Sequence, residues 1–503
     1  MRIFRLKNLE IQHLWAVTVI LGVFVFVNTQ PIRPNDFWWH MAIGREISAS
    51  RSIPVVDEYS YTMAGEPYPS YQMFWLPEVV MYQVYELGGP ALVIFLQSVI
   101  ITSAYAILLY LCWRISNSLR IASMATLFAI GMGIFNWTVR PQTISYLIGV
   151  LFLLAIFSYR QNQKYRWLLV FPLGMIVWVN SHGSFLIGLA LIGIWLADEV
   201  WNIIAAKYSK QPDVPKQGLW TAMISLAATT LVCVINPRGI GIVSYVLDLT
   251  GNPVVRNLVP EWAPPSFDTD YGTVYLIGLL LCSVVLAISE KRPNFFQLVS
   301  FLMFGILGLM TTRGVIWFGI VMAPVLADHI PSVLSRFIQP RSERSTGVSK
   351  TGINRVILAL LIMITIISLP WLKKYLPFPQ SKRGLIYHET PIEATQFLIS
   401  ERLPGKLFHD MGYGSYLIWA AYPDYRVFTD PRIELYPLET WRDYTAIGNA
   451  LPGWENQLDR YGIYTLMVSP ENQAPLVAAL GGSPGWSLKY EDQAALIYTR
   501  NDP

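Results

Sequence analysis

The sequence predicts a mostly α, polytopic membrane protein with about 11 transmembrane helices, followed by a C-terminal soluble α/β domain. Three observations lead to this fold class. First, 53% of the 503 residues are hydrophobic and 14% are charged, whereas soluble proteins carry about 25% charged residues. Second, several apolar runs reach the roughly 20 residues that span a bilayer. Third, the tail alternates strand-like and helix-like runs, which is typical of an α/β domain.

The apolar runs define the expected membrane helices. The first run lacks the small-residue cleavage site of a signal peptide, so we interpret it as a retained anchor. Cys112, Cys233 and Cys282 all lie within apolar runs, and therefore no disulfide framework is indicated. The expected helices lie near residues 11–28, 90–113, 121–138, 142–158, 167–180, 184–204, 219–236, 272–288, 295–311, 314–333 and 355–372.

Basic residues give this topology an orientation. They follow every second helix, and Arg114, Arg160, Lys207, Lys291 and Arg336 are examples. Cytoplasmic loops are enriched in Lys and Arg. We therefore expect a multi-pass protein of the cytoplasmic membrane, with its N-terminus in the cytoplasm and its C-terminal domain outside.

The same topology divides the chain into two domains. Residues 1–372 form the expected transmembrane domain, with long outer loops at 29–89 and 237–271. Residues 373–503 form the expected extracytoplasmic α/β domain. In that tail, strand-like runs lie at 406–409, 425–429, 463–469 and 494–499, and helix-like runs at 391–401, 413–421, 454–461 and 474–480.

A carboxylate with aromatic neighbours follows the first helix. The segment at residues 36–40 reads Asp-Phe-Trp-Trp-His, and residues four apart share one helix face. Asp36 and His40 are therefore expected to point into one cavity. The alternative is an interfacial helix with Trp at headgroup depth and Asp36 as its N-terminal cap.

Further polar residues occur at the expected outer ends of membrane helices, where ionisable groups are costly and usually face a cavity or a partner. Arg140 and Arg313 each lie at such an end, Asn180 and His182 lie in one outer turn, and Glu261 lies in the second long outer loop. All of these map to the face that carries Asp36. We expect them to line one site.

The residue types suggest roles at that site. Arginines match the oxygens of a phosphate or diphosphate, so Arg140 and Arg313 are expected to bind one. Asp36 would act as a general base, or Asp36 and Glu261 would help to hold a divalent cation such as Mg²⁺ or Mn²⁺. His40, Asn180 and His182 would line the substrate site. Each residue also has a structural alternative, such as carbonyl capping by Arg140, a tight turn at His182, a solvated loop acid at Glu261 or lipid-phosphate pairing by Arg313.

Two other polar clusters are expected to be structural. Asp57 and Glu58 are adjacent acids, and we interpret them as a solvated turn in which at most one faces Asp36. The tail motifs at 409–416 and 428–436 contain many Tyr and acidic residues. Packing of the α/β core accounts for them, and a sugar-contacting surface is the alternative.

The first outer loop resembles that of polytopic glycosyltransferases with the GT-C fold. The resemblance rests on Asp36, Arg45-Glu46, Ile53-Pro54, Gly65-Glu-Pro-Tyr68, Trp75-Leu76 and Tyr85-Glu-Leu-Gly88. It is similar to protein O-mannosyltransferases and lipid A aminoarabinose transferases, and the topology resembles the oligosaccharyltransferase catalytic subunit. The resemblance implies a polyprenyl-phosphate-linked sugar donor and places the catalytic acid of the loop at Asp36.

The chain departs from that pattern at two points. Phe37 replaces the second acid of a pair, and Ser70-Tyr-Gln-Met73 replaces a Lys-Pro-Pro stretch, so Arg140 or Arg313 would take over the phosphate contact. We expect an inverting glycosyltransferase whose partners are the bilayer, the lipid-linked donor and an acceptor, with no nucleic acid. The alternatives are a flippase or transporter of lipid-linked glycans, which should carry broken helices near mid-membrane, and a non-catalytic GT-C-like assembly partner.

Overall fold

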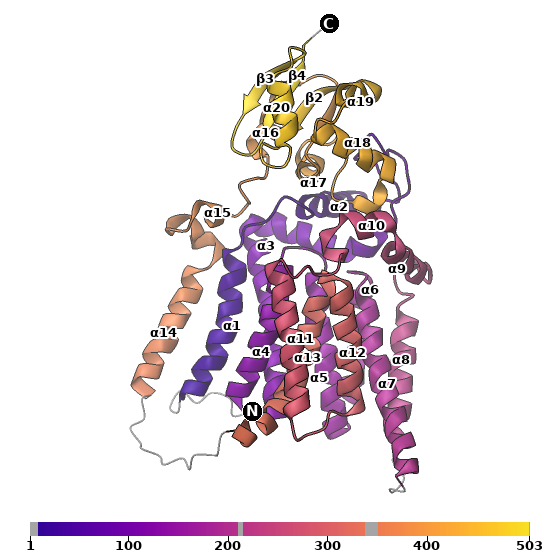
Figure 1. Ribbon diagram of the computed structural model, residues 1–503, viewed down its shortest axis with the longest axis vertical. Helices are drawn as coiled ribbons and strands as arrows, with labels where there is room; N and C mark the ends of the chain where they lie inside the picture. Colours follow the sequence, from indigo (N-terminus) through magenta and orange to yellow (C-terminus); the bar gives the residue numbers. More distant parts are fainter. Residues whose placement is uncertain (1–8, 210–214, 338–350, 502–503) are drawn as a thin grey trace.

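The computed structural model describes residues 9–209, 215–337 and 351–501. It consists of a helical bundle with a smaller α/β domain on one end, and the segments that join the two lie between them (Figure 1). The predicted boundary between residues 372 and 373 falls within the short helix η5 (Pro370–Tyr375).

Within the described residues, seven helices are long and apolar enough to cross a membrane, which makes this a multi-pass membrane protein. Four shorter apolar helices occupy the remaining predicted positions, so all of the predicted spans are helical, and the total of 11 crossings stays a prediction. The seven are α1 (Ile11–Thr29), α3 (Tyr71–Ser116), α4 (Leu119–Gly133, extended by η2 to Asn136), α5 (Thr143–Asn162), α7 (Phe185–Tyr208), α11 (Asp270–Ile288) and α13 (Thr312–Phe337). The four are α6 (Val170–Val179), α8 (Gln217–Val232), α12 (Phe295–Met310) and α14 (Thr351–Ile367).

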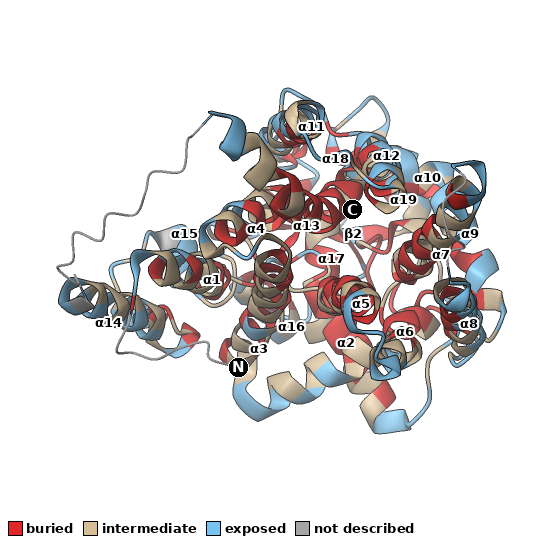
Figure 2. Cartoon of the chain, turned by 90° about the horizontal axis from the view of Figure 1, so that it is seen from below, coloured by how far each residue is buried: buried red, intermediate tan, exposed pale blue. Residues whose placement is uncertain are grey.

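Helix α13 forms the centre of the bundle. It packs against α3, α4, α11 and α12, and Figure 2 shows buried residues around it and exposed ones at the periphery. Small residues allow the close approach that lipid-embedded helices need. At Gly319 of α13, for example, an added Cβ would lie 2.5 Å from the Cβ of Met132 on α4. By contrast, α14 lies at the edge beside α1 (Figure 2).

Helix α3 is broken where the first outer loop was predicted to end. Gly88 and Gly89 have non-helical backbone angles, and Pro90 follows them. Gly89 has φ 62° and ψ −164°, a conformation that is essentially restricted to glycine. The break separates residues 71–87, which pack beside α2 (Phe37–Ser50), from the membrane-spanning half of α3.

The second outer loop also contains short helices. These are α9 (Gly241–Gly251), α10 (Pro253–Leu258) and η4 (Pro260–Trp262). Together with α2 they lie at the end of the bundle that carries the α/β domain (Figure 1). Segments of both long outer loops therefore cover the end of the bundle that faces the C-terminal domain.

The C-terminal domain contains one four-stranded sheet of order β1-β2-β4-β3. Strand β1 (Lys406–His409) is parallel to β2 (Ile463–Val468), whereas β4 (Leu496–Arg500) is antiparallel to both β2 and β3 (Trp486–Glu491). Leu407 lies opposite Thr465, and Met467 opposite Ile497. The helices are α16 (Ile392–Ser400), α17 (Met411–Ala420), α18 (Leu438–Gly448), α19 (Trp454–Tyr461) and α20 (Ala474–Gly481).

Most of the predicted tail elements are present, and one is wrong. Residues 425–429 form no strand; instead, Val427 makes an isolated bridge with Ser60 of the first outer loop. Strand β3 and helix α18 were not predicted. An apolar run indicates that a segment is buried, but it does not indicate which segment packs against it. Here Val427 pairs with the first outer loop and not with the sheet of its own domain.

A buried ion network joins the first outer loop to this domain. Arg432 donates from Nη1 to Asp57 Oδ1 at 2.6 Å and from Nη2 to Asp430 Oδ2 at 2.6 Å, and all three side chains are inaccessible to solvent. The prediction of a solvated turn at Asp57 is therefore wrong, because its counter-ion lies 375 residues away in the chain. We call Asp57, Asp430 and Arg432 the interdomain clamp.

Candidate active site

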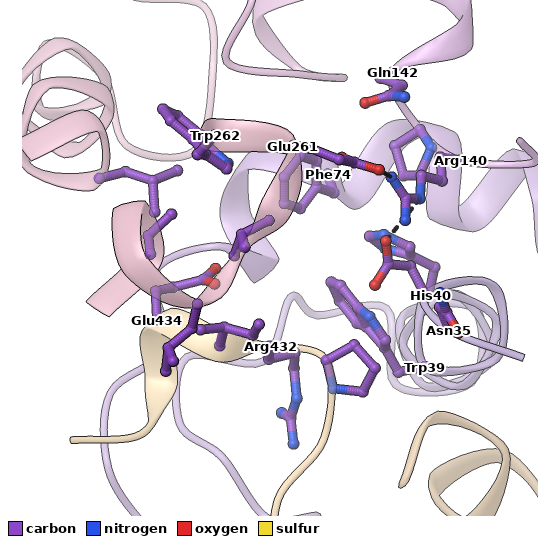
Figure 3. A pocket seen from close by; sticks show the side chains of 18 of the residues that line it. Asn35, Trp39, His40, Phe74, Arg140, Gln142, Glu261, Trp262, Arg432 and Glu434 are labelled. Atoms are coloured by element: carbon purple, nitrogen blue, oxygen red, sulfur yellow. Dashed lines mark hydrogen bonds and ion pairs between the residues drawn. The ribbon is translucent and has the colours of Figure 1, made fainter. Parts of the chain in front are cut away.

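A cavity of about 380 Å³ lies between the bundle and the C-terminal domain. Its walls come from the start of α2, the 140–142 turn, the second outer loop, the start of α13 and the 431–434 segment of the tail. Six of the seven predicted site residues line it: Asp36, His40, Arg140, His182, Glu261 and Arg313. Segments far apart in sequence thus converge on one cavity, as Figure 3 shows.

Asp36 precedes the first residue of α2, but its carboxylate does not cap that helix. Its Oδ2 instead forms an ion pair with Arg140 Nε at 2.8 Å. This contact removes the capping alternative. It directs the carboxylate toward the cavity, where 21% of the side chain is exposed.

Four charged side chains form a row across the cavity wall. Arg140 Nη1 donates to Glu261 Oε1 at 2.6 Å, and Arg313 Nε donates to Glu261 Oε2 at 2.9 Å. Signs alternate along the row Asp36–Arg140–Glu261–Arg313, so its formal charge is zero. We call these four residues the charge ladder; two of its contacts are the dashed lines in Figure 3.

The charge ladder shifts the pKa values of Glu261 and Arg140. Burial disfavours the charged form of Glu261, but Arg140 and Arg313 outweigh burial and lower its pKa to about 2. The two neighbouring carboxylates outweigh burial at Arg140 as well and raise the pKa of its guanidinium. Glu261 and Arg140 are therefore both ionised near neutral pH.

The two cavity histidines are neutral near neutral pH. Burial, with the positive charges of Arg313 and Arg140, lowers the pKa of His182 to about 3, and its Nδ1 lies 2.8 Å from Ser184 Oγ. Burial also lowers the pKa of His40. Its Nδ1 lies 2.7 Å from Glu78 Oε1, so this contact is a hydrogen bond of a neutral imidazole rather than an ion pair.

Asn180 lies outside the cavity lining. Its Oδ1 accepts from Trp75 Nε1 at 2.8 Å, and its Nδ2 donates to the carbonyl oxygens of Ile176 and Ile235. The amide therefore joins the end of α6 to α3 and to the segment that follows α8. The structure places it in a supporting position rather than in contact with a substrate.

The tail contributes a cavity residue that sequence reasoning missed. Glu434 lines the cavity opposite Arg140 (Figure 3). Its Oε1 accepts from Tyr68 Oη at 2.7 Å and from Ser70 Oγ at 2.8 Å. The available signal was the 428–436 motif, whose Arg432 anchors the segment to the first outer loop.

The predicted alternative of a divalent cation on Asp36 and Glu261 does not fit these residues. The Arg140 guanidinium lies between the two carboxylates and binds both. In the described parts of the chain, no group of three or more His, Cys, Asp or Glu side chains is placed to hold a metal ion. A cation that bridged Asp36 and Glu261 would have to displace the Arg140 guanidinium. These two carboxylates would then be its only acidic ligands among the described residues.

Arg140 also lines a second, apolar cavity. This groove of about 240 Å³ lies between α3, the 139–144 segment and the end of α6. Its walls include Leu76, Val80, Ile144 and Val177, and Val80 and Val177 are exposed on the apolar outside of the bundle. Arg140 therefore lies where a lipid-facing groove meets a polar cavity.

No protein-family model matches the chain, and no curated protein matches its sequence. Several solved structures do match the chain. Arabinofuranosyltransferase AftD from Mycobacteria matches with a TM-score of 0.57 at 13% identity over 96% of this chain and 41% of that one. The oligosaccharyltransferase of Archaeoglobus fulgidus in its apo form matches at 0.55 and 13%, over 97% and 74%. ArnT from Cupriavidus metallidurans in the apo state matches at 0.51 and 13%, over 96% and 97%.

The chain thus spans less than half of AftD but nearly all of ArnT. These matches extend over both the bundle and the C-terminal domain, and at this identity they establish the fold. The resemblance in the first outer loop is confirmed at that level. The chain has the GT-C fold of polytopic membrane glycosyltransferases.

Proposed function

We propose that this protein is an inverting GT-C glycosyltransferase. It moves a sugar from a polyprenyl-phosphate-linked donor to an acceptor at the outer face of the cytoplasmic membrane, with Asp36 as general base. The observation that carries the proposal is the position of Arg140. One guanidinium lines both an apolar groove and a polar cavity that contains a carboxylate.

This position suits a donor with one apolar and one polar part. The polyprenyl chain would occupy the groove lined by Leu76, Val80 and Val177. Its phosphate would then reach Arg140 and Arg313, and the sugar would enter the cavity beside Asp36. An archaeal oligosaccharyltransferase that matches this chain with a TM-score of 0.50 was solved in complex with a dolichol-phosphate, which supports this class of donor.

Donor binding would also prepare the base. Without the donor, Asp36 is paired with Arg140 and the charge ladder is neutral. A phosphate that accepts from Arg140 competes with Asp36 for that guanidinium, which leaves the Asp36 carboxylate available to the acceptor. The acceptor oxygen then bonds to the anomeric carbon, the bond from that carbon to phosphate breaks, and Asp36 takes the acceptor proton.

Binding of undecaprenyl phosphate to the purified protein tests the donor site. We expect Arg140→Ala to weaken binding strongly, because one guanidinium contacts the phosphate at the junction of groove and cavity. The control is Arg238→Ala, which removes an arginine of the same outer face that lies outside the cavity lining and pairs with Gln72. Native mass spectrometry measures the bound fraction. Equal binding by Arg140→Ala and wild type would contradict the proposed site.

A turnover assay tests the proposed role of Asp36 as general base. A radiolabelled polyprenyl-phosphate-linked sugar is incubated with the protein in liposomes, and release of label from the lipid is followed. We expect Asp36→Asn to lower the rate about 10²- to 10⁴-fold, as for loss of a general base, while undecaprenyl phosphate still binds. Asp248→Asn, an exposed acid on α9, is the control. Binding without turnover by the wild type would favour the non-catalytic partner, and movement of intact donor between leaflets would favour the flippase.

A further inference from the structure

A second large cavity lies at the opposite end of the bundle from the charge ladder. It measures about 390 Å³ and lies between α3, α5, the start of α12 and α13. Its deep wall is apolar and includes Leu111, Leu153, Phe157, Val321 and Pro324. The proposed transfer reaction has no use for this cavity.

The mouth of this cavity is polar and cationic. Arg160, Gln161, Lys291 and Asp328 lie on its rim. Lys291 Nζ donates to Asp328 Oδ1 at 2.5 Å while 53% of its side chain stays exposed. Beyond the rim, Arg114 donates to Gln161 Oε1.

Arg160 is fixed in place from behind the cavity. Its Nη2 donates at 2.5 Å to Asp198, a carboxylate that is 1% exposed and that also accepts from the Phe296 amide. A guanidinium has five N–H donors and an ammonium has three. Arg160 Nε also lies 3.8 Å from Glu199 Oε1. Arg160 donates to Asp198 and Lys291 donates to Asp328, so each cation keeps further N–H donors that can be directed into the cavity mouth.

The cavity lining itself carries two cations and one carboxylate, so its formal charge is positive; Asp198 and Glu199, which pair with Arg160, lie outside that lining. It lies among the basic loops that the positive-inside rule assigns to the cytoplasm. Anionic lipids are enriched in that leaflet, and basic pockets between membrane helices bind their headgroups. A soluble anion would make no use of the apolar wall, and an uncharged lipid would make no use of the rim.

The geometry points to a binding site for an anionic phospholipid of the cytoplasmic leaflet. One acyl chain occupies the apolar cavity between Leu153, Phe157 and Val321, and the headgroup phosphate accepts hydrogen bonds from Arg160 and Lys291. This site is independent of the proposed glycosyl transfer, because it shares no residue with the charge ladder.

The test measures lipid binding to delipidated, purified protein by native mass spectrometry. Phosphatidylglycerol, phosphatidylcholine and inorganic phosphate are titrated separately, and phosphate is also added in competition. We expect phosphatidylglycerol to bind more tightly than phosphatidylcholine by more than tenfold, since two cations each contribute about fivefold. Millimolar phosphate should not displace the lipid.

Two rim variants locate the site. Lys291→Gln removes a cation and Gln161→Glu adds an anion, and each should weaken phosphatidylglycerol binding about fivefold. Both side chains are exposed, and thermal unfolding checks that both variants are folded. The matched control is Lys207→Gln, an exposed lysine in the last turn of α7 outside the cavity, which should bind as wild type does.

Three results would overturn the inference. Phosphatidylcholine could bind as tightly as phosphatidylglycerol, which removes the charge selectivity. Folded Lys291→Gln and Gln161→Glu proteins could both bind phosphatidylglycerol with wild-type affinity, which would show that the lipid binds at another place on the protein. Displacement of the lipid by inorganic phosphate would show a headgroup-only anion site without an acyl-chain cavity.

Discussion

At the scale of single residues, Glu261 holds the two arginines of the charge ladder together. Each of its oxygens accepts from a different guanidinium, Arg140 on one side and Arg313 on the other. Without Glu261, two like charges would face each other across a partly buried cavity. The carboxylate therefore keeps both arginines in place before an anionic substrate arrives.

The low pKa of Glu261 predicts how this stabilisation depends on pH. Its folded-state pKa of about 2 lies below the ordinary value of 4.5, so the ionised form is favoured by folding. That stabilisation is complete above pH 4.5 and is lost as the pH falls toward 2. We expect Glu261→Gln to unfold at a lower temperature than wild type at pH 7, with a difference that shrinks below pH 4.5.

Thermal unfolding in detergent at a series of pH values measures this difference. Glu58→Gln, an exposed acid of the first outer loop, serves as the control. A Glu261→Gln difference that grew on acidification would contradict the ladder as the source of the pKa shift.

At the scale of elements, the break in α3 determines where the first outer loop meets the membrane. The segment 71–87 supplies Phe74 to the active cavity and Leu76 to the apolar groove, while residues 90–116 cross the bundle. A continuous helix would carry the first segment away from α2. The two glycines before Pro90 provide the change of direction, because a proline ends the helix pattern that precedes it.

This role of the break predicts the effect of Gly89→Ala. The substituted Cβ meets no atom within 4 Å, so any cost comes from the backbone conformation alone. We expect a loss of about 1–3 kcal/mol, the cost of a non-glycine residue in such a region. The comparison is Gly22→Ala in α1, where an added Cβ also meets nothing within 4 Å. If both variants were equally stable in thermal unfolding, the break would not need a glycine.

At the scale of the whole molecule, the interdomain clamp fixes the C-terminal domain above the bundle. Arg432 lies within 6 Å of the ring centroids of Tyr59, Tyr68 and Tyr71 from the first outer loop. The residues that follow it carry Glu434 into the active cavity. The cavity wall is therefore complete only when the C-terminal domain is docked on the first outer loop.

Removal of the clamp cation should separate the two parts. Arg432→Met leaves Asp57 and Asp430 buried without their counter-ion, and breaking such a buried pair costs about 3–5 kcal/mol. We expect a lower unfolding temperature and faster tryptic release of a tail fragment. Arg460→Met, which removes an exposed ion pair within the same domain, should behave as wild type does. Unchanged proteolysis of Arg432→Met would show that the clamp does not hold the domains together.

The proposed orientation is tested by cysteine labelling, because the three native cysteines are buried. Leu488→Cys on β3, 46% exposed, should react with a membrane-impermeant maleimide in intact spheroplasts. Tyr208→Cys at the end of α7, 84% exposed, should react only after permeabilisation. The reverse pattern would place the C-terminal domain in the cytoplasm. It would also contradict the proposal that transfer takes place at the outer face of the membrane.

Sequence reasoning succeeded where the signal is local. Apolar runs of membrane length act within one segment, so the helices and the end of the first outer loop near residue 89 were predictable. Asp36, Arg140 and Arg313 were also identifiable, because charge at the end of a membrane helix is costly wherever the chain folds. The loop resemblance correctly indicated the GT-C fold.

Other features depend on partners that are distant in sequence. Asp57 is buried with Arg432 as its counter-ion, Val427 pairs with Ser60 rather than with the sheet, and Asn180 bonds to Trp75 instead of lining the cavity. By itself, then, the sequence determined the membrane-spanning helices and the charges of the site. The tertiary structure alone decided which charges pair and that the tail closes the cavity, because an ion pair or a β-bridge forms between groups brought together by packing, whatever their separation along the chain.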